Sequence, residues 1–277
     1  LGGVSLALVA GEIAGVVGPA GAGKTTVLRV AAGLLRPDAG AARVEGVAVS
    51  SPAARRLLGY ARDTPVFPPA LTVREALTYY GRLHAGGPSR HSLVRDAIDL
   101  AGLSSVAKVR TGRLDRAGLH RLALAQAALG GRRVLLLDET LSGLDPVARR
   151  DLGMRIAHLA ARGVAVLLAA RDVAALERIA ARVVVLRDGR IVRAGTIGAL
   201  LRERVLEVIL DRPPSEAPPG FRITAAGVEA SLTGRTAEAA LALCHVHRLA
   251  VRATRVRVKS LEEIVLDAHD AAPPAAH

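Results

Sequence analysis

Cysteine and aromatic residues are scarce in this sequence of 277 residues, and long apolar runs are missing. The single cysteine, Cys244, excludes an internal disulfide and suits a reducing compartment. With no tryptophan, three tyrosines and two phenylalanines, the core must consist of Ala, Val, Leu and Ile, as is typical of parallel strands buried on both faces. No run reaches the roughly 18 apolar residues that a membrane-spanning helix needs. The chain also has no initiator methionine, so we expect it to begin inside a longer reading frame.

Lysine contributes little to the net charge of +13. The lysines are Lys24, Lys108 and Lys259, and the other basic residues are arginines spread along the whole length. Binding of single-stranded nucleic acid needs a basic groove with interleaved aromatic side chains, and the sequence has no such tract. We therefore expect no nucleic-acid partner. The explanation that we favour for the positive charge is that the arginines lie on the solvated surface of the protein. The second explanation is that they attract anionic lipid headgroups.

A glycine-rich loop lies between an apolar segment suited to a strand, Ile13 to Val17, and a segment with helical spacing, Val27 to Leu35. Strand, glycine loop and helix is the context in which such a loop binds phosphate. Small residues let backbone N–H groups point at phosphate oxygens, and the helix adds its positive dipole end. We predict that Lys24 reaches the β- and γ-phosphates and that the Thr25 hydroxyl binds Mg²⁺. The predicted nucleotide-binding residues are Gly18, Pro19, Ala20, Gly21, Ala22, Gly23, Lys24, Thr25 and Thr26.

A second motif is a buried strand that ends in two carboxylates. Residues Val134 to Leu137 are apolar, Asp138 and Glu139 follow, and the next segment reads Thr-Leu-Ser-Gly-Leu-Asp-Pro. In a fold with a phosphate-binding loop, such an aspartate organises the Mg²⁺ shell and the following glutamate polarises the attacking water. A strand that merely ends at an acidic loop would explain one carboxylate but not the pair with this segment behind it.

These motifs, with Gly59-Tyr60 and the hairpin from Val183 to Arg190, make residues 3–200 resemble the nucleotide-binding subunits of ABC transporters. The resemblance implies an α/β fold, a P-loop NTPase core with a mixed sheet flanked by helices. It also implies a helical insert at about 66–130 that receives a coupling helix from a membrane partner. The implied cofactors are ATP and Mg²⁺. The implied partners are an integral membrane transporter subunit and a second ABC subunit, with the chain cytoplasmic and peripheral to the inner face of the cell membrane.

Three positions depart from the family pattern. Asp63 stands where the family has the Q-loop glutamine, and Arg171 stands where it has the switch histidine. Because one new charge is negative and the other positive, we hypothesise an Asp63–Arg171 ion pair. The alternative arrangement places Arg171 on the γ-phosphate, where an arginine can stabilise transition-state charge, and Asp63 near Mg²⁺. Both residues are therefore candidate catalytic residues beside Glu139, and independent decay of an unused site is the competing explanation.

The third departure is the signature segment, where Leu114-Asp-Arg-Ala-Gly118 replaces Leu-Ser-Gly-Gly-Gln. In the family the signature serine donates a hydrogen bond to the partner's γ-phosphate, whereas an ionised Asp115 can only accept. Asp115 is a good N-cap for a helix over 116–129, so we favour a local capping role and loss of the signature role. A homodimer would then have two weakened sites, and a heterodimer with an intact partner would keep one.

After residue 204 the composition changes. We predict an ATP-binding domain over 1–204, a strand and proline-rich linker over 205–220, a small α+β accessory domain over 221–270 and a disordered tail over 271–277. Ser260-Leu-Glu-Glu263 is a capping box that predicts the last helix. This region resembles the C-terminal extension of ABC subunits that serve exporters of drugs, lipids or polysaccharides.

The sequence thus predicts an ABC-type ATPase subunit that energises export through a separate membrane protein. An alternative from a different class is a regulatory or structural subunit that binds ATP, hydrolyses little and depends on an intact partner. A soluble ABC protein acting on nucleic acid is a third interpretation. It would predict tandem phosphate loops or a long coiled-coil insert, and the sequence has neither.

Overall fold

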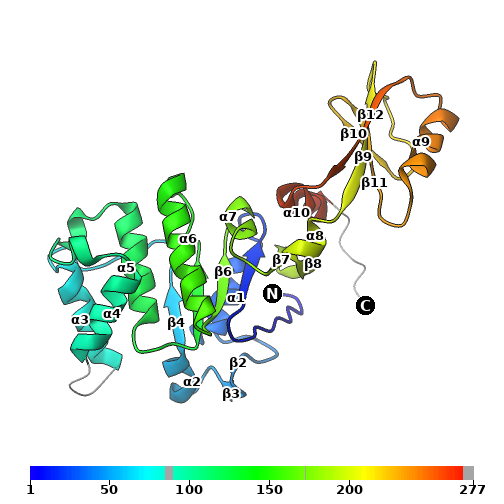
Figure 1. Cartoon of the computed structure of the whole chain (residues 1–277). Coiled ribbons are helices and arrows are strands. Elements are labelled where there is room, and N and C mark those ends of the chain that lie inside the picture. The colour runs from blue at the N-terminus through cyan, green and yellow to red at the C-terminus, as the bar shows by residue number, and fades with distance from the viewer. Residues whose placement is uncertain (85–89, 172, 271–277) are drawn as a thin grey trace. The chain divides into compact units, whose positions relative to one another are not determined.

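The computed structural model describes residues 1–84, 90–171 and 173–270, and the predicted disordered tail lies outside them (Figure 1). The described chain divides into two compact units. Among the described residues, unit 1 comprises those of Leu1–Ala194 together with residues 268–270, and unit 2 comprises Gly195–Asp267. The predicted domain limit at residue 204 lies within unit 2.

The sheet of unit 1 has the strand order β4-β5-β6-β1-β7-β8. The pairs β4·β5, β5·β6, β6·β1 and β1·β7 are parallel. Residues Asp188 and Gly189 join β7 to β8, and both have the positive φ angles, 49° and 73°, that a tight hairpin favours. The strand bounds are Ile13–Val17 for β1, Leu58–Ala61 for β4, Val134–Asp138 for β5, Ala165–Ala169 for β6, Arg182–Arg187 for β7 and Arg190–Thr196 for β8.

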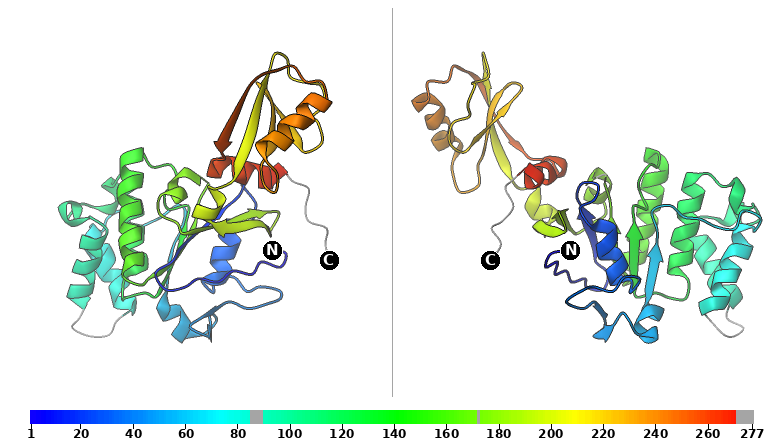
Figure 2. Two further views of the ribbon diagram at one scale, coloured as in Figure 1. Left: turned by 45° about the vertical axis from the view of Figure 1, so that its right-hand side comes forward. Right: turned by 180° about the vertical axis from the view of Figure 1, so that it is seen from behind.

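Helices cover both faces of this sheet. Figures 1 and 2 show α1 on one face and α6 on the other. The predicted parallel core is present, because β1, β5 and β6 are almost entirely buried and consist of Ala, Val, Leu, Ile and Gly up to Asp138. The helices of unit 1 are α1 Lys24–Ala31, α2 Pro52–Leu57, α3 Val73–His84, α4 Arg90–Leu100, α5 Arg116–Ala128, α6 Pro146–Ala161 and α7 Val173–Glu177.

The predicted helical insert corresponds to α3, α4 and α5, which lie together at one end of unit 1 (Figure 1). The 3₁₀ helices η1 Ser104–Val106 and η2 Thr111–Arg113 connect α4 to α5. A small antiparallel hairpin around Gly46 consists of β2 Arg43–Val44 and β3 Val47–Ala48. In the described residues, no helix combines the length and the apolar character required to cross a membrane.

Unit 2 contains a sheet with the order β10-β11-β9-β12 and a helix against one face. Strand β9, which the sequence analysis placed with the linker at 205–220, is a central strand of this sheet. Its alternate residues Leu206, Val208 and Leu210 are buried in the cluster that includes Ala240 and Cys244 of α9. The bounds are α8 Ile197–Leu200, β9 Arg204–Leu210, β10 Phe221–Thr224, β11 Gly227–Ser231, α9 Ala237–Val246, β12 Val251–Val258 and α10 Leu261–Asp270.

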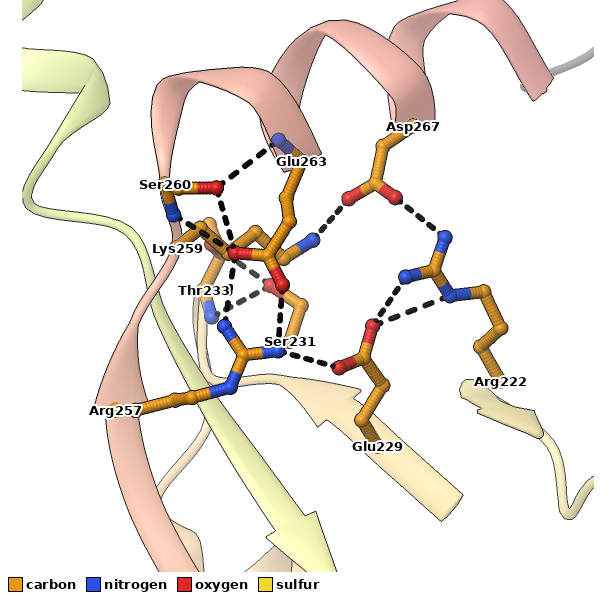
Figure 3. A network of polar contacts seen from close by, with 9 residues as sticks. All are labelled: Arg222, Glu229, Ser231, Thr233, Arg257, Lys259, Ser260, Glu263 and Asp267. Atoms are coloured by element: carbon orange, nitrogen blue, oxygen red, sulfur yellow. Dashed lines mark hydrogen bonds and ion pairs between the residues drawn. The ribbon is translucent and has the colours of Figure 1, made fainter. Parts of the chain in front are cut away.

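A network of ion pairs connects three strands of unit 2 to α10 (Figure 3). At its centre the Glu229 side chain, only 6% exposed, binds Arg222 at 2.6 Å and Arg257 at 3.0 Å. Arg257 also binds Glu263 at 2.7 Å. The capping box predicted at the start of α10 is confirmed, since the Glu263 carboxylate accepts from the backbone N–H of Ser260 at 2.8 Å and the Ser260 hydroxyl accepts from the Glu263 N–H at 3.2 Å.

Candidate nucleotide-binding site

The parallel register of unit 1 brings the ends of three strands together. Ala169 of β6 lies opposite Val16 of β1 and opposite Asp138 of β5. The residues that follow these strands therefore share one edge of the sheet, which is where ligands bind in open α/β folds. Gly18 follows β1, Glu139 follows Asp138, and Arg171 follows β6 within two residues.

The glycine loop adopts a backbone that requires glycine. Gly18 has φ 152°, and a β-carbon there would lie 2.2 Å from the carbonyl oxygen of Leu186. Gly23 has φ 101° and is the N-cap residue of α1. In the described part of the chain, no side chain caps the first turn of α1, and no acidic residue occupies it. Free N–H groups and the positive end of the helix dipole thus meet at the loop, and together they favour an anion.

Lys24 is buried against its own loop. Its Nζ atom donates to the carbonyl oxygens of Gly18 at 2.7 Å and Pro19 at 2.9 Å, and it lies 3.8 Å from Oε1 of Glu139. Burial lowers the pKa of Lys24, and the Glu139 carboxylate opposes that shift. The ammonium group thus lies within the loop, between backbone acceptors and a carboxylate.

The two predicted metal ligands lie in contact with each other. The Thr25 hydroxyl donates to Oδ1 of Asp138 at 3.1 Å, and the Tyr60 hydroxyl donates to Oδ2 at 3.1 Å. Burial raises the pKa of Asp138, and the hydrogen bonds from Thr25 and Tyr60 oppose that rise. A hydroxyl beside a carboxylate is an oxygen donor set that suits Mg²⁺, which is usually held by one or two carboxylates plus substrate phosphates. Residues 1–84, 90–171 and 173–270 contain no cluster of three or more His, Cys, Asp or Glu side chains that could hold a metal alone.

Glu139 is held by three side chains. Its carboxylate, 8% exposed, accepts from the Ser142 hydroxyl at 2.5 Å and from Nε of Arg171 at 3.2 Å, and it faces Lys24. Its backbone has φ 51°, an unusual value for a residue with a side chain. Such strain persists where the surroundings fix the residue, and it often occurs at functional sites.

The structure does not form the hypothesised Asp63–Arg171 ion pair. Arg171 binds Glu139 instead, and within the described residues Asp63 is exposed and makes no ion pair. The reason is the strand order. Asp63 follows the edge strand β4, whereas Arg171 follows β6, and β5 lies between them. Neighbouring strands are about 4.8 Å apart, so Glu139 after β5 is the nearer carboxylate.

The predicted N-cap role of Asp115 is confirmed. Its side chain accepts from the backbone N–H of Gly118 at 2.7 Å, at the start of α5. The guanidinium of the next residue, Arg116, lies against Gly143, where a β-carbon would meet it at 2.7 Å.

Sequence reasoning missed two polar contacts of the site. Tyr60 was noted only as part of the Gly59-Tyr60 pair, and Ser142 only as part of the segment after Glu139. A signal for Tyr60 was available, because a long polar side chain near the end of β4 lies at the same edge as the end of β5.

Comparisons with known proteins agree with this geometry. Residues 1–142 match the family model described as ABC transporter. The chain is 34% identical over 238 residues to the Nod factor export ATP-binding protein I of Burkholderia lata, covering 84% of this chain and 78% of that protein. It is 35% identical over 207 residues to the protein of the same name from Rhizobium sp. (strain N33), covering 73% of this chain and 68% of that protein.

Solved structures show the same likeness. An ATP-binding subunit of an ABC transporter superposes with a TM-score of 0.64 and 26% identity, covering 72% of this chain and 84% of that chain. A dimeric bacterial ABC transporter cassette, at 21% identity, shares the fold with a TM-score of 0.64 and covers 69% of this chain and 88% of that chain. The chain therefore belongs to the ABC transporter ATP-binding family and is an ABC-type ATPase.

Proposed function

We propose that this chain binds Mg-ATP at the edge formed by β1, β5 and β6 and hydrolyses it to energise export through a separate membrane subunit. The observation that carries the proposal is the convergence of an ammonium group, a hydroxyl–carboxylate pair and a second buried carboxylate beside an uncapped helix start. Each of these groups has a known task in phosphoryl transfer. Lys24 and the N–H groups of residues 18–26 would bind the phosphates.

Phosphate binding would exchange one set of acceptors for another. Lys24 donates to two loop carbonyls, Gly18 and Pro19. These neutral acceptors resemble phosphate oxygens in geometry but carry less charge, and hydrogen bonds to charged acceptors are roughly twice as strong. The ammonium group can therefore turn to the β- and γ-phosphates. Thr25 and Asp138 would hold Mg²⁺, which when bound neutralises developing charge on the phosphates.

Glu139 would orient the attacking water. Its carboxylate is buried next to Lys24, so a water between it and the γ-phosphate would be held at a fixed distance. Nε of Arg171 donates a hydrogen bond to one oxygen of this carboxylate, and the Arg171 side chain is 69% exposed. Because the Arg171 end of the pair is largely solvated, screening weakens its attraction to Glu139, and the more highly charged γ-phosphate would compete for Arg171 effectively. We propose that Arg171 then stabilises transition-state charge and that Asp63 stays near the Mg²⁺ site.

The same contacts also favour the alternative function, a subunit that binds ATP but hydrolyses little. All three neighbours of Glu139 reduce its freedom to take a proton from water. Asp115 uses its side chain to cap α5, so it offers no donor to a partner's nucleotide. In this alternative, a second ABC subunit with an intact signature segment would supply the competent site.

Two observations support the export role: the names of the relatives and an exposed groove on unit 1. The relatives named above are called Nod factor export ATP-binding proteins, which supports export as the direction. A groove in unit 1 lined by Arg29, Tyr60, Arg62, Val66 and Phe67, among others, has an exposed apolar rim, with Val66 71% exposed. We propose that this groove receives the membrane subunit, which would keep the chain at the cytoplasmic face of the membrane. The cargo would be a drug, lipid or polysaccharide.

The test compares turnover of Mg-ATP by the purified chain with that of Glu139→Gln. Removing a general base lowers the rate about 100-fold or more, while nucleotide binding remains. Glu177→Gln, a change at an exposed residue of α7, is the matched control and should leave the rate unchanged. Equal background rates for wild type and Glu139→Gln would support the weak-subunit alternative. Absence of Mg-ATP binding at millimolar ligand in calorimetry would refute both.

A further inference from the structure

The Asp138 carboxylate is fully buried, and each of its oxygens has one side-chain donor in the described chain. Oδ1 accepts from Thr25 and Oδ2 from Tyr60. We infer that Tyr60 is a positioning residue that fixes the orientation of Asp138 for Mg²⁺. This inference rests on the proposed function, because it concerns the same metal site.

The backbone explains why a tyrosine at this position reaches the carboxylate. Tyr60 of β4 lies opposite Leu136 of the parallel strand β5, and Asp138 is two residues further along on the same face. Neighbouring strands lie about 4.8 Å apart and two residues advance about 6.6 Å along a parallel strand, so these diagonal neighbours are about 8 Å apart, a distance that an aromatic side chain can span. The phenol ring bridges that gap and its hydroxyl ends 3.1 Å from Oδ2. A phenylalanine would have the same shape and no donor.

The direction of the Tyr60 proton follows from its partner. An ionised carboxylate can only accept, so the phenol donates its proton to Oδ2 of Asp138. The two oxygens of this carboxylate are thus held by donors from two different elements, Thr25 of α1 and Tyr60 of β4.

The two donors to Asp138 are not equivalent. Thr25 is itself a predicted metal ligand, so its hydroxyl oxygen must face the metal when the metal binds. Tyr60 is then the side chain in the described chain that keeps Asp138 in place from outside the metal shell. Residues that orient metal-ligating carboxylates in this way typically change metal affinity or activity by 10–100-fold when they are mutated.

The experiment measures ATP binding to the full chain by isothermal titration calorimetry at a series of Mg²⁺ concentrations. The readout is the Mg²⁺ concentration at which the gain in ATP affinity reaches half of its maximum. Tyr60→Phe should raise that concentration about ten-fold. ATP affinity measured in EDTA should stay unchanged, because the phosphate loop is untouched. Tyr79→Phe is the matched control, since Tyr79 is 53% exposed on α3. Thermal unfolding of both variants verifies that they fold.

A double variant separates positioning from general packing. In an Asp138→Asn background, Tyr60→Phe should cause no further loss of Mg²⁺ dependence, whereas a packing defect would add to the first loss. If wild type shows Mg²⁺-dependent ATP binding and Tyr60→Phe matches Tyr79→Phe, the inference is overturned and the proposed function stands. If wild type shows no Mg²⁺-dependent ATP binding, the proposed function is overturned and this inference falls with it.

Discussion

The buried carboxylate of Glu229 in unit 2 gives a stability prediction that can be worked from distances. Glu229 lies opposite Arg222 on β10 and opposite Glu207 on β9, so two like charges are neighbours across the sheet. The Arg257 guanidinium neutralises both charges: it lies 3.0 Å from Glu229 (Figure 3) and 3.8 Å from Glu207. We choose Arg257→Met as the perturbation, because methionine keeps much of the apolar stem and removes the charge.

The expected cost is about 2 kcal/mol. Removing one partner of a fully buried ion pair costs about 3–5 kcal/mol, because the other charge stays buried and uncompensated. Two features reduce this value here. Arg222 remains on Glu229 at 2.6 Å, and the Arg257 side chain is 23% exposed, so it is not fully desolvated in the native state. About half of the buried-pair value therefore remains.

The assay is amide hydrogen exchange of the full chain, read by mass spectrometry. It reports β9, β11 and β12 of unit 2 separately from the strands of unit 1, which avoids assuming one unfolding transition. Arg252→Met, at an exposed position of the same strand β12, is the matched control and should change stability by less than about 0.5 kcal/mol. Adding Glu229→Gln to Arg257→Met should recover part of the loss, because no buried charge remains. Equal protection in the two single variants would refute the reasoning.

Two further predictions concern a helix cap and acid stability. Asp115→Ala should destabilise α5 by about 1 kcal/mol, whereas Asp115→Ser, which can still cap, should stay within about 0.5 kcal/mol; chemical denaturation checks both. The hydrogen bond from Arg257 holds the pKa of Glu263 at about 2, below its ordinary 4.5. A pKa that is depressed in the native state stabilises the fold at pH values above the ordinary pKa of 4.5, and this contribution is lost as the pH falls through about 2. Partial exposure reduces it to about 1–2 kcal/mol. Wild type should therefore exceed Glu263→Gln in stability at pH 6, and the difference should shrink between about pH 4.5 and pH 2; a constant difference would contradict this assignment.

Local signals in the sequence predicted most of the elements that position the site. The apolar run before Gly18 and the run before Asp138 are strands because Val, Ile and Leu in short unbroken stretches suit burial on both faces. The caps at Asp115 and Ser260 were predictable because a capping interaction spans only three residues. Interactions of this kind depend on neighbours in the chain, so the sequence contains them directly.

Contacts between distant segments were harder to predict. Charge balance alone suggested that Asp63 pairs with Arg171, but the order β4-β5-β6 places Glu139 between them and gives Arg171 a different partner. The sequence does not state which strands are neighbours, so it could not choose between two carboxylates.

What the sequence by itself determined is the chemistry: a glycine loop with Lys24 and Thr25, and a strand that ends in Asp138 and Glu139. What only the tertiary structure decided is which side chains hold those groups, Tyr60 on Asp138 and Arg171 on Glu139. The physical reason is that a motif is short and fixed by local backbone geometry. The partners of its side chains come from residues as many as 113 positions apart, and only strand order and register bring them within hydrogen-bonding distance.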